Sequence, residues 1–167
     1  MNATAVHQAP VADEHHERIV RHVDHMPHTG DLIDHGQPGE LKVALDETCG
    51  FLTELLVPHM EAAEKAIYPE LERLFQNRHS MTPMRREHDE IRADIKALDS
   101  IRSHIGDAPL GPGEAIRLRR SLFRLYALLK VHLAEERLYA DMVEYGASPE
   151  REAALAAAME HSGTSAF

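Results

Sequence analysis

The stretch EAIRLRRSLFRLYALLKVHLAEERLYADMVEY, residues 114–145, decides the fold of this 167-residue chain. Its apolar residues recur in alternating steps of three and four, which is the spacing of one face of an α-helix. This face consists of Ala115, Leu118, Leu122, Leu125, Leu129, His132, Glu136, Tyr139 and Val143. A histidine and a glutamate therefore stand on the stripe that should face the core.

Three further stretches show helical spacing, and no stretch of useful length alternates like a β-strand. A helix is expected over residues 13–27, where Pro27 should kink or end it because proline cannot donate a backbone hydrogen bond. Two more are expected over residues 41–75 and 82–105. The apolar stripe of the first ends with Ile67, Leu71 and Leu74, and that of the second consists of Met84, His88, Ile91, Ile95 and Leu98. Four long helices with short loops predict an all-α, antiparallel four-helix bundle over residues 13–146. Residues 147–167 predict a short C-terminal helix and a tail.

Composition narrows the function classes. The chain has 18 Lys and Arg against 28 Asp and Glu, a formal net charge of −10, which disfavours nucleic acid and anionic membranes as partners. No apolar run reaches the roughly 18 residues of a membrane span. A single cysteine and a start without an apolar signal segment indicate the cytoplasm. We expect one domain, as a monomer or homodimer.

Every predicted helix places one histidine on its apolar stripe, and two helices add a carboxylate. The set is His16, His59, Glu64, His88, His132 and Glu136. Burying such groups without partners costs roughly 1–3 kcal/mol each, and far more for an ionised carboxylate. A metal ion would compensate, because imidazole and carboxylate suit iron, manganese or zinc. Six ligands exceed the needs of one tetrahedral zinc, so two octahedral metals with a solvent-derived bridging oxygen fit better.

The other histidines and the cysteine are expected to have no such role. His22, His25 and His28 crowd the expected end of the first helix and should be solvated turn residues. His7, His15, His35, His79, His104 and His161 lie near predicted helix ends or on polar faces, and we expect them to be structural or at the surface. Cys49 lies on an apolar phase and is expected to be a small buried residue.

The four-helix region resembles the hemerythrin-like HHE cation-binding domains. His132 and Glu136, followed by Tyr139, are similar to the family's His-x-x-x-Glu motif with its downstream aromatic residue. The run PHMEAAEKAIYPEL, residues 58–71, is similar to the family's histidine, acidic cluster and aromatic-proline run. His88, in an Arg-Glu-His-x-x-Ile context, and His16 each match singly.

The resemblance implies a non-haem centre with two iron ions per chain, joined by an oxo or hydroxo bridge. The implied ligands are the six residues on the stripes. The family's usual carboxylate after His59 falls on Ala63, so Glu64 is the favoured ligand here and Glu61 is the alternative. Tyr68 and Tyr139 could donate hydrogen bonds to a ligand carboxylate or to bound oxygen, or could simply fill the core.

Such a protein would bind, sense or handle dioxygen, peroxide, nitric oxide or iron. Arg92 stands where the oxygen-carrying hemerythrins have a further histidine, which favours oxidation or peroxide decomposition over reversible oxygen carriage. No dedicated enzyme is expected, although oxidase activity is compatible with such a centre. The alternatives are a metal-free helical interaction module and a bundle loaded with zinc or manganese.

The step of five residues from His59 to Glu64 needs a local change in the helix. In a regular α-helix this step turns the two side chains about 140° apart. A π-bulge would bring Glu64 back toward the core, and Pro58 and Pro69 already remove backbone hydrogen bonds nearby. We therefore predict an i to i+5 bond or a kink within residues 54–69, with Glu64 turned inward.

Overall fold

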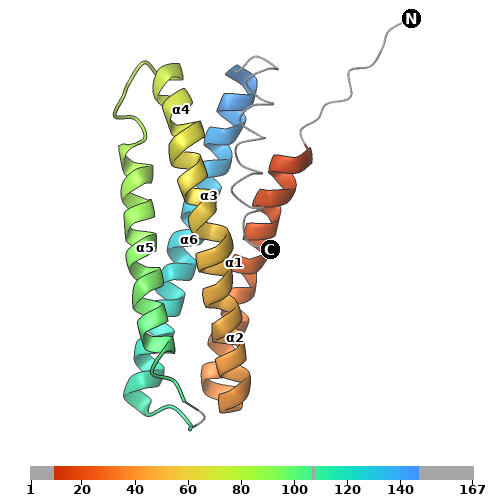
Figure 1. Ribbon diagram of the computed structural model, residues 1–167, viewed down its shortest axis with the longest axis vertical. Coiled ribbons are helices and arrows are strands. Elements are labelled where there is room, and N and C mark those ends of the chain that lie inside the picture. Colours follow the sequence, from red (N-terminus) through yellow and green to blue (C-terminus); the bar gives the residue numbers. More distant parts are fainter. Residues whose placement is uncertain (1–9, 107, 147–167) are drawn as a thin grey trace, which may run out of the picture.

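All regular structure in the described part of the chain is helical. The computed structural model describes residues 10–106 and 108–146, and these helices form four rods that lie side by side (Figure 1). The rods are α1 (Pro10–His35); a second rod of α2 (Pro38–Phe51), η1 (Leu52–Leu56), α3 (Val57–Ala62), η2 (Ala63–Ile67) and α4 (Tyr68–Leu74); α5 (Thr82–Arg102); and α6 (Pro112–Gly146). The all-α class and the helical bundle are thus confirmed. The predicted helix within residues 147–167 lies outside the described residues.

The first helix is longer than predicted, because Pro27 does not end it. Helix α1 continues through this residue to His35. The missing N–H removes one backbone bond, but Met26 and Thr29 on either side are both buried, and Thr29 Oγ1 lies 3.2 Å from Thr48 Oγ1 on α2. Contacts with the neighbouring rods therefore outweigh the local cost of the proline, which is about 3 kcal/mol in an isolated helix.

Gly30 lets α1 approach α6 closely. A Cβ atom at this position would lie 2.7 Å from Phe123 Cε2, which is shorter than any real carbon–carbon contact. The absence of a side chain is therefore what allows the two helices to pack at this point, and any larger residue must displace the Phe123 ring.

The second rod contains two π-helical segments, and one of them is the predicted bulge. In η2, the N–H of Tyr68 donates to the carbonyl of Ala63, which is an i to i+5 bond. In η1, the N–H of Val57 donates to the carbonyl of Leu52 in the same way. Pro58 and Pro69 are the second residues of the α-helices that follow, so each π segment ends where a regular backbone donor is missing. The prediction of a widened helix is confirmed.

The helical stripes face the core as their spacing predicts. On α5 the buried residues are the expected Met84, His88, Ile91, Ile95 and Leu98. Leu74, at the end of α4, departs from the pattern because it is 39 % exposed. None of the helices in the described ranges is both long enough and apolar enough to cross a lipid bilayer.

Two apolar clusters fill the bundle, and polar residues separate them. On α5, Met84 belongs to the smaller cluster and Ile91 to the larger one, and buried His88 stands between them. The same interruption falls on α6, where His132 and Glu136 follow Leu129. The buried side chains of His59, His88, His132 and Glu136 therefore form one polar layer across the bundle.

Candidate metal centre

Three buried side chains from α5 and α6 form the centre of this layer. His88, His132 and Glu136 are at most 4 % exposed. Each can offer one ligand atom such that all three atoms lie within 4.8 Å of one another. Because His132 and Glu136 are four residues apart on one helix, they share a face, and His88 approaches them from the neighbouring rod.

Carboxylates accept a hydrogen bond from Nδ1 of each of these two imidazole rings. The Nδ1–H of His88 donates to Glu64 Oε1 at 2.7 Å, and the Nδ1–H of His132 donates to Glu87 Oε2 at 2.9 Å. An ionised carboxylate only accepts, so each neutral ring carries its proton on Nδ1 and a lone pair on Nε2. The two Nε2 atoms lie 3.0 Å apart. Two lone pairs therefore face each other in a buried site.

Electrostatics favour the forms of these groups that bind metal. Burial, followed by the charge of His132, lowers the pKa of His88 to about 4, so its ring is neutral near pH 7. Burial would raise the pKa of Glu64, but hydrogen bonds from Arg92 and His88 outweigh it and hold this pKa below its usual value. The centre thus combines an uncharged imidazole with an ionised carboxylate behind it.

Tyr68 adds a buried phenol oxygen to the centre. Its hydroxyl lies 3.0 Å from His88 Nε2, and it donates to that lone pair. The side chain is fully buried, and the guanidinium of Arg85 lies 5.2 Å from the ring centroid. Burial, followed by the charge of Glu136, raises the pKa of Tyr68. Tyr68 therefore does more than fill the core.

Glu136 connects this centre to the second rod. Its Oε2 lies 2.8 Å from His59 Nε2, and both side chains are buried. Burial would raise the pKa of Glu136, but the charge of His59 and its hydrogen bond lower that pKa to about 2. Glu136 Oε1 and His59 Nδ1 are buried without a hydrogen-bond partner. A buried carboxylate with an unpaired oxygen is unfavourable, and a bound cation would compensate for it.

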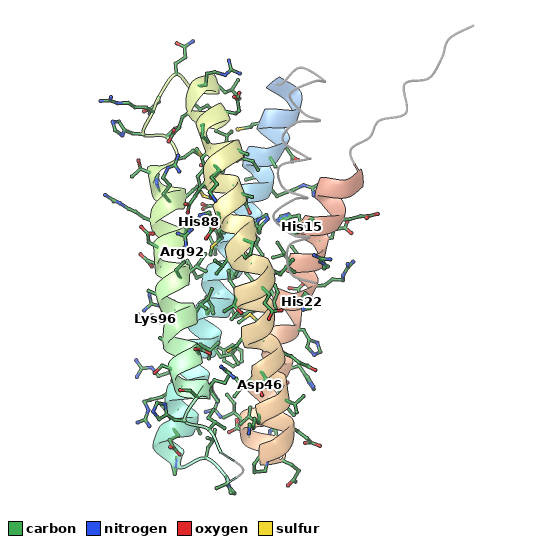
Figure 2. The ribbon with its side chains drawn as sticks, in the orientation of Figure 1. His15, His22, Asp46, His88, Arg92 and Lys96 are labelled. Carbon is green, nitrogen blue, oxygen red and sulfur yellow. The ribbon has the colours of Figure 1, made fainter. Side chains whose placement is uncertain are left out.

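Two consecutive histidines of α1 lie against His59. The ring centroids of His15 and His59 are 5.4 Å apart, and those of His16 and His59 are 6.2 Å apart. His15, which was expected to be structural or at the surface, is half-buried and lies beside His59. Burial, followed by the charge of His59, lowers the pKa of His15 to about 4. Figure 2 shows His15 at about the same height along the bundle as His88.

Three predicted site residues lie outside this cluster or behind it. The carboxylate of Glu64 contacts the back of His88 and, at 2.8 Å, the guanidinium of Arg92. Glu61 is an exposed residue whose Oε2 lies 3.5 Å from Lys65 Nζ. Tyr139 packs edge-on against Phe75, with 6.4 Å between the ring centroids. Glu61 and Tyr139 thus contact residues outside the cluster, whereas Glu64 contacts His88, which is a candidate metal ligand.

The histidines near Pro27 lie on a continuous helix and not on the expected turn. His22 stacks on Phe51 with 4.7 Å between the ring centroids. His25 and His28 lie next to each other, with 5.0 Å between their centroids. All three are exposed, so the expectation of solvated side chains is confirmed while that of a turn is wrong.

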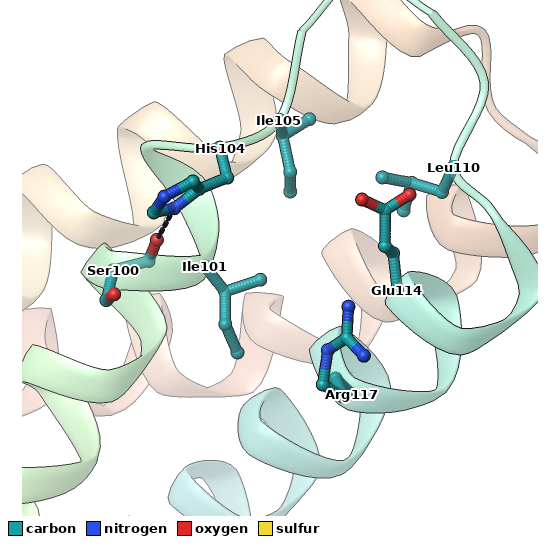
Figure 3. A pocket seen from close by; sticks show the side chains of 7 residues that line it. All are labelled: Ser100, Ile101, His104, Ile105, Leu110, Glu114 and Arg117. Carbon is teal, nitrogen blue, oxygen red and sulfur yellow. Dashed lines mark hydrogen bonds between the residues drawn. The ribbon is translucent and has the colours of Figure 1, made fainter.

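A surface pocket of about 220 Å³ is lined by residues outside the buried polar layer. Figure 3 shows its lining, which comes from the end of α5, the following loop and the start of α6. His104 stands at its edge, where Nδ1 lies 2.6 Å from the Ser100 carbonyl oxygen. The pocket contains Glu114 and Arg117 but none of the residues of the buried layer.

The residues of the buried layer fit a transition-metal centre. Neutral imidazole, carboxylate and phenol are donors that iron, manganese and zinc accept. The facing Nε2 lone pairs and the unused oxygen of Glu136 are the unfavourable contacts that a cation would turn into favourable ones. His88, His132 and Glu136 could hold one ion, and His59 lies against Glu136 beside them.

Replacing Glu87 with alanine is expected to weaken metal binding by about 10- to 100-fold, because the His132 ring then loses the group that orients it. Co²⁺ titration of the metal-free protein would measure the change. Glu90→Ala is the matched control, since Glu90 is an exposed glutamate of the same helix. Equal Co²⁺ affinity in the two variants would contradict the orienting role of Glu87.

Sequence comparison agrees with this geometry. The sequence model of the Hemerythrin HHE cation binding domain matches residues 9–143, which include every residue of the candidate centre. No curated protein and no solved structure matches the chain at a significant level.

Proposed function

Since the chain belongs to the hemerythrin HHE cation-binding domain family, we propose that its buried layer holds two iron ions within an antiparallel four-helix bundle. The observation that carries the proposal is the pair of Nε2 atoms of His88 and His132, 3.0 Å apart. Both rings have their Nδ1 protons engaged by carboxylates, so their Nε2 lone pairs face each other. The Tyr68 hydroxyl donates to that of His88, and a cation would bind both nitrogens.

Different residues would hold the two ions. His88, His132 and Glu136 would bind the first, with the Tyr68 hydroxyl next to them. His59 and His16 would bind the second, and Glu136 would reach both because it also contacts His59. In this proposal Glu64 and Glu87 orient the imidazole rings, which is the role their contacts support.

The small ligand of the centre would be dioxygen, peroxide or nitric oxide. Ferrous iron, when bound, would supply electrons for reducing dioxygen or peroxide. Met84, Ile91 and Leu129, each within one helical turn of His88 or His132, are buried and would limit the access of bulk water, and the buried Tyr68 hydroxyl donates a hydrogen bond to His88. These features support sensing or oxidative handling of the ligand.

Reversible oxygen carriage is disfavoured by Arg92. This residue occupies the position of a further histidine in the oxygen-carrying hemerythrins, and its guanidinium is paired with Glu64. One ion would therefore keep a position without a protein ligand, where a reacting molecule can bind. We propose a centre that oxidises in air to a stable ferric form.

Iron analysis combined with absorption spectra tests this function. Protein purified without oxygen is expected to contain about two iron ions per chain, and exposure to air should produce stable ferric absorption in the near ultraviolet. Repeated, reversible oxygenation would contradict the proposed reaction. Zinc or manganese in place of iron would contradict the choice of metal. A metal-free protein whose melting temperature does not respond to Fe²⁺ would instead indicate a helical interaction module.

A further inference from the structure

Two histidines of α1 are equally well placed to face the core. The buried residues Ile19, Val23 and Met26 define the inner face of this helix. At about 100° per residue, the side chain of His15 leaves the helix about 50° to one side of this face, and that of His16 about 50° to the other. Both residues can therefore contact His59, which packs against this side of α1.

The contacts agree with this helical geometry. The ring of His16 is stacked on that of His59, with an interplanar angle of 8°. The ring of His15 is tilted by 34° and its centroid is the nearer of the two, at 5.4 Å. His59 is thus bordered by two imidazoles from α1 and by the Glu136 carboxylate from α6.

Three potential metal-ligand atoms on His59 and its neighbours have no hydrogen-bond partner. His15 Nε2, His59 Nδ1 and Glu136 Oε1 are all buried without a hydrogen-bond partner. Leaving a buried polar atom without a partner is unfavourable. One cation bound by these three neighbouring side chains would remove all three unfavourable contributions.

Among the described residues, the nearby candidates on the second rod offer no free metal ligand to this half of the centre. Ala63 has no donor atom, Glu64 is engaged by His88 and Arg92, and Glu61 is exposed beside Lys65. Without a further group, the second ion would have only His16, His59 and the shared Glu136. An additional imidazole would complete a nitrogen-rich site, which suits a divalent transition metal.

We infer that His15 is a ligand of the second metal ion, together with His16, His59 and Glu136. This assignment rests on the proposed metal centre, and it makes the two positions chemically different. The first position has two imidazoles, a carboxylate and a neighbouring phenol. The second has three imidazoles and the same carboxylate.

Co²⁺ titration of the metal-free protein without oxygen tests the assignment, with bound metal counted by elemental analysis. The wild type is expected to bind two ions per chain. His15→Ala should keep one ion at wild-type affinity and bind the other about tenfold or more weakly. His22→Ala is the matched control, because His22 is another α1 histidine that contacts an aromatic ring. It should bind both ions as the wild type does.

Folding of each variant is checked by circular dichroism of the metal-free protein, and His15→Gln replaces His15→Ala if the latter does not fold. Two ions bound with wild-type affinity in the folded His15 variant would overturn the assignment. Equal weakening of both ions would also overturn it, because His15 borders only the His59 side. A wild-type protein that binds no Co²⁺ would instead overturn the proposed metal centre itself.

Discussion

Replacement of Glu136 with alanine is expected to remove both of the proposed metal ions from the protein. This carboxylate is the one group that meets both halves of the centre. Its Oε2 contacts His59, and it forms a possible ligand set with His88 and His132. Loss of a single histidine should weaken one position, whereas loss of Glu136 also removes the negative charge that balances the cations in a buried site. Elemental analysis after iron loading would measure the effect.

Two further variants separate charge from position. Glu136→Gln keeps the shape and an acceptor oxygen, so it should retain more metal than the alanine variant but less than the wild type. Glu135→Ala changes the adjacent glutamate, which is only partly buried, and should bind metal as the wild type does. Two ions retained by Glu136→Ala would show that this carboxylate is not shared between the positions.

Acidification from pH 6.5 to 4 is expected to destabilise the metal-free protein by about 3 kcal/mol. The main cause is His88, which is fully buried and whose pKa is lowered by burial to about 4. In the unfolded chain the same side chain takes up a proton near pH 6.5. Between these values the unfolded state binds more protons than the folded state, so stability falls as the pH falls. Half-buried His15 should act in the same direction with a smaller effect.

Urea unfolding at several pH values would measure this loss. The His88→Gln variant is the control, because its side chain does not titrate, and its stability should fall less over the same range. Equal pH dependence in the wild type and in His88→Gln would contradict the explanation. Below about pH 4.5 Glu136 adds to the loss in both proteins, because it takes up a proton in the unfolded chain near that pH, whereas its pKa is about 2 in the folded protein.

Helical periodicity alone predicted the buried face of α5. The spacing of Met84, His88, Ile91, Ile95 and Leu98 named the inner face of α5, and all five are buried. The same property located the widened turn after His59, where the apolar phase slips by one residue and Ala63 begins a π-helical segment. These features are readable from a sequence because a helix is a local structure whose faces repeat at a constant angle.

Local signals failed where neighbouring rods decided the outcome. Pro27 is a strong local reason for a helix to stop, yet α1 continues because the residues around it are buried against other helices. Tertiary packing can outweigh a local preference of a few kcal/mol, since several buried side chains contribute about 1.5–3 kcal/mol each. The end of such a helix therefore depends on residues distant in the sequence.

The sequence by itself determined the four-helix class, the inner faces and the inward places of His59, His88, His132 and Glu136. The tertiary structure alone decided which atoms meet. Glu64 was expected as a ligand but contacts the back of His88, Glu87 reaches His132 on another rod, and His15 joins His59. The physical reason is that periodicity gives only the direction of a side chain from its own helix. Contacts within 3 Å depend on how each rod is rotated and shifted against its neighbours, and packing across the whole bundle sets those positions.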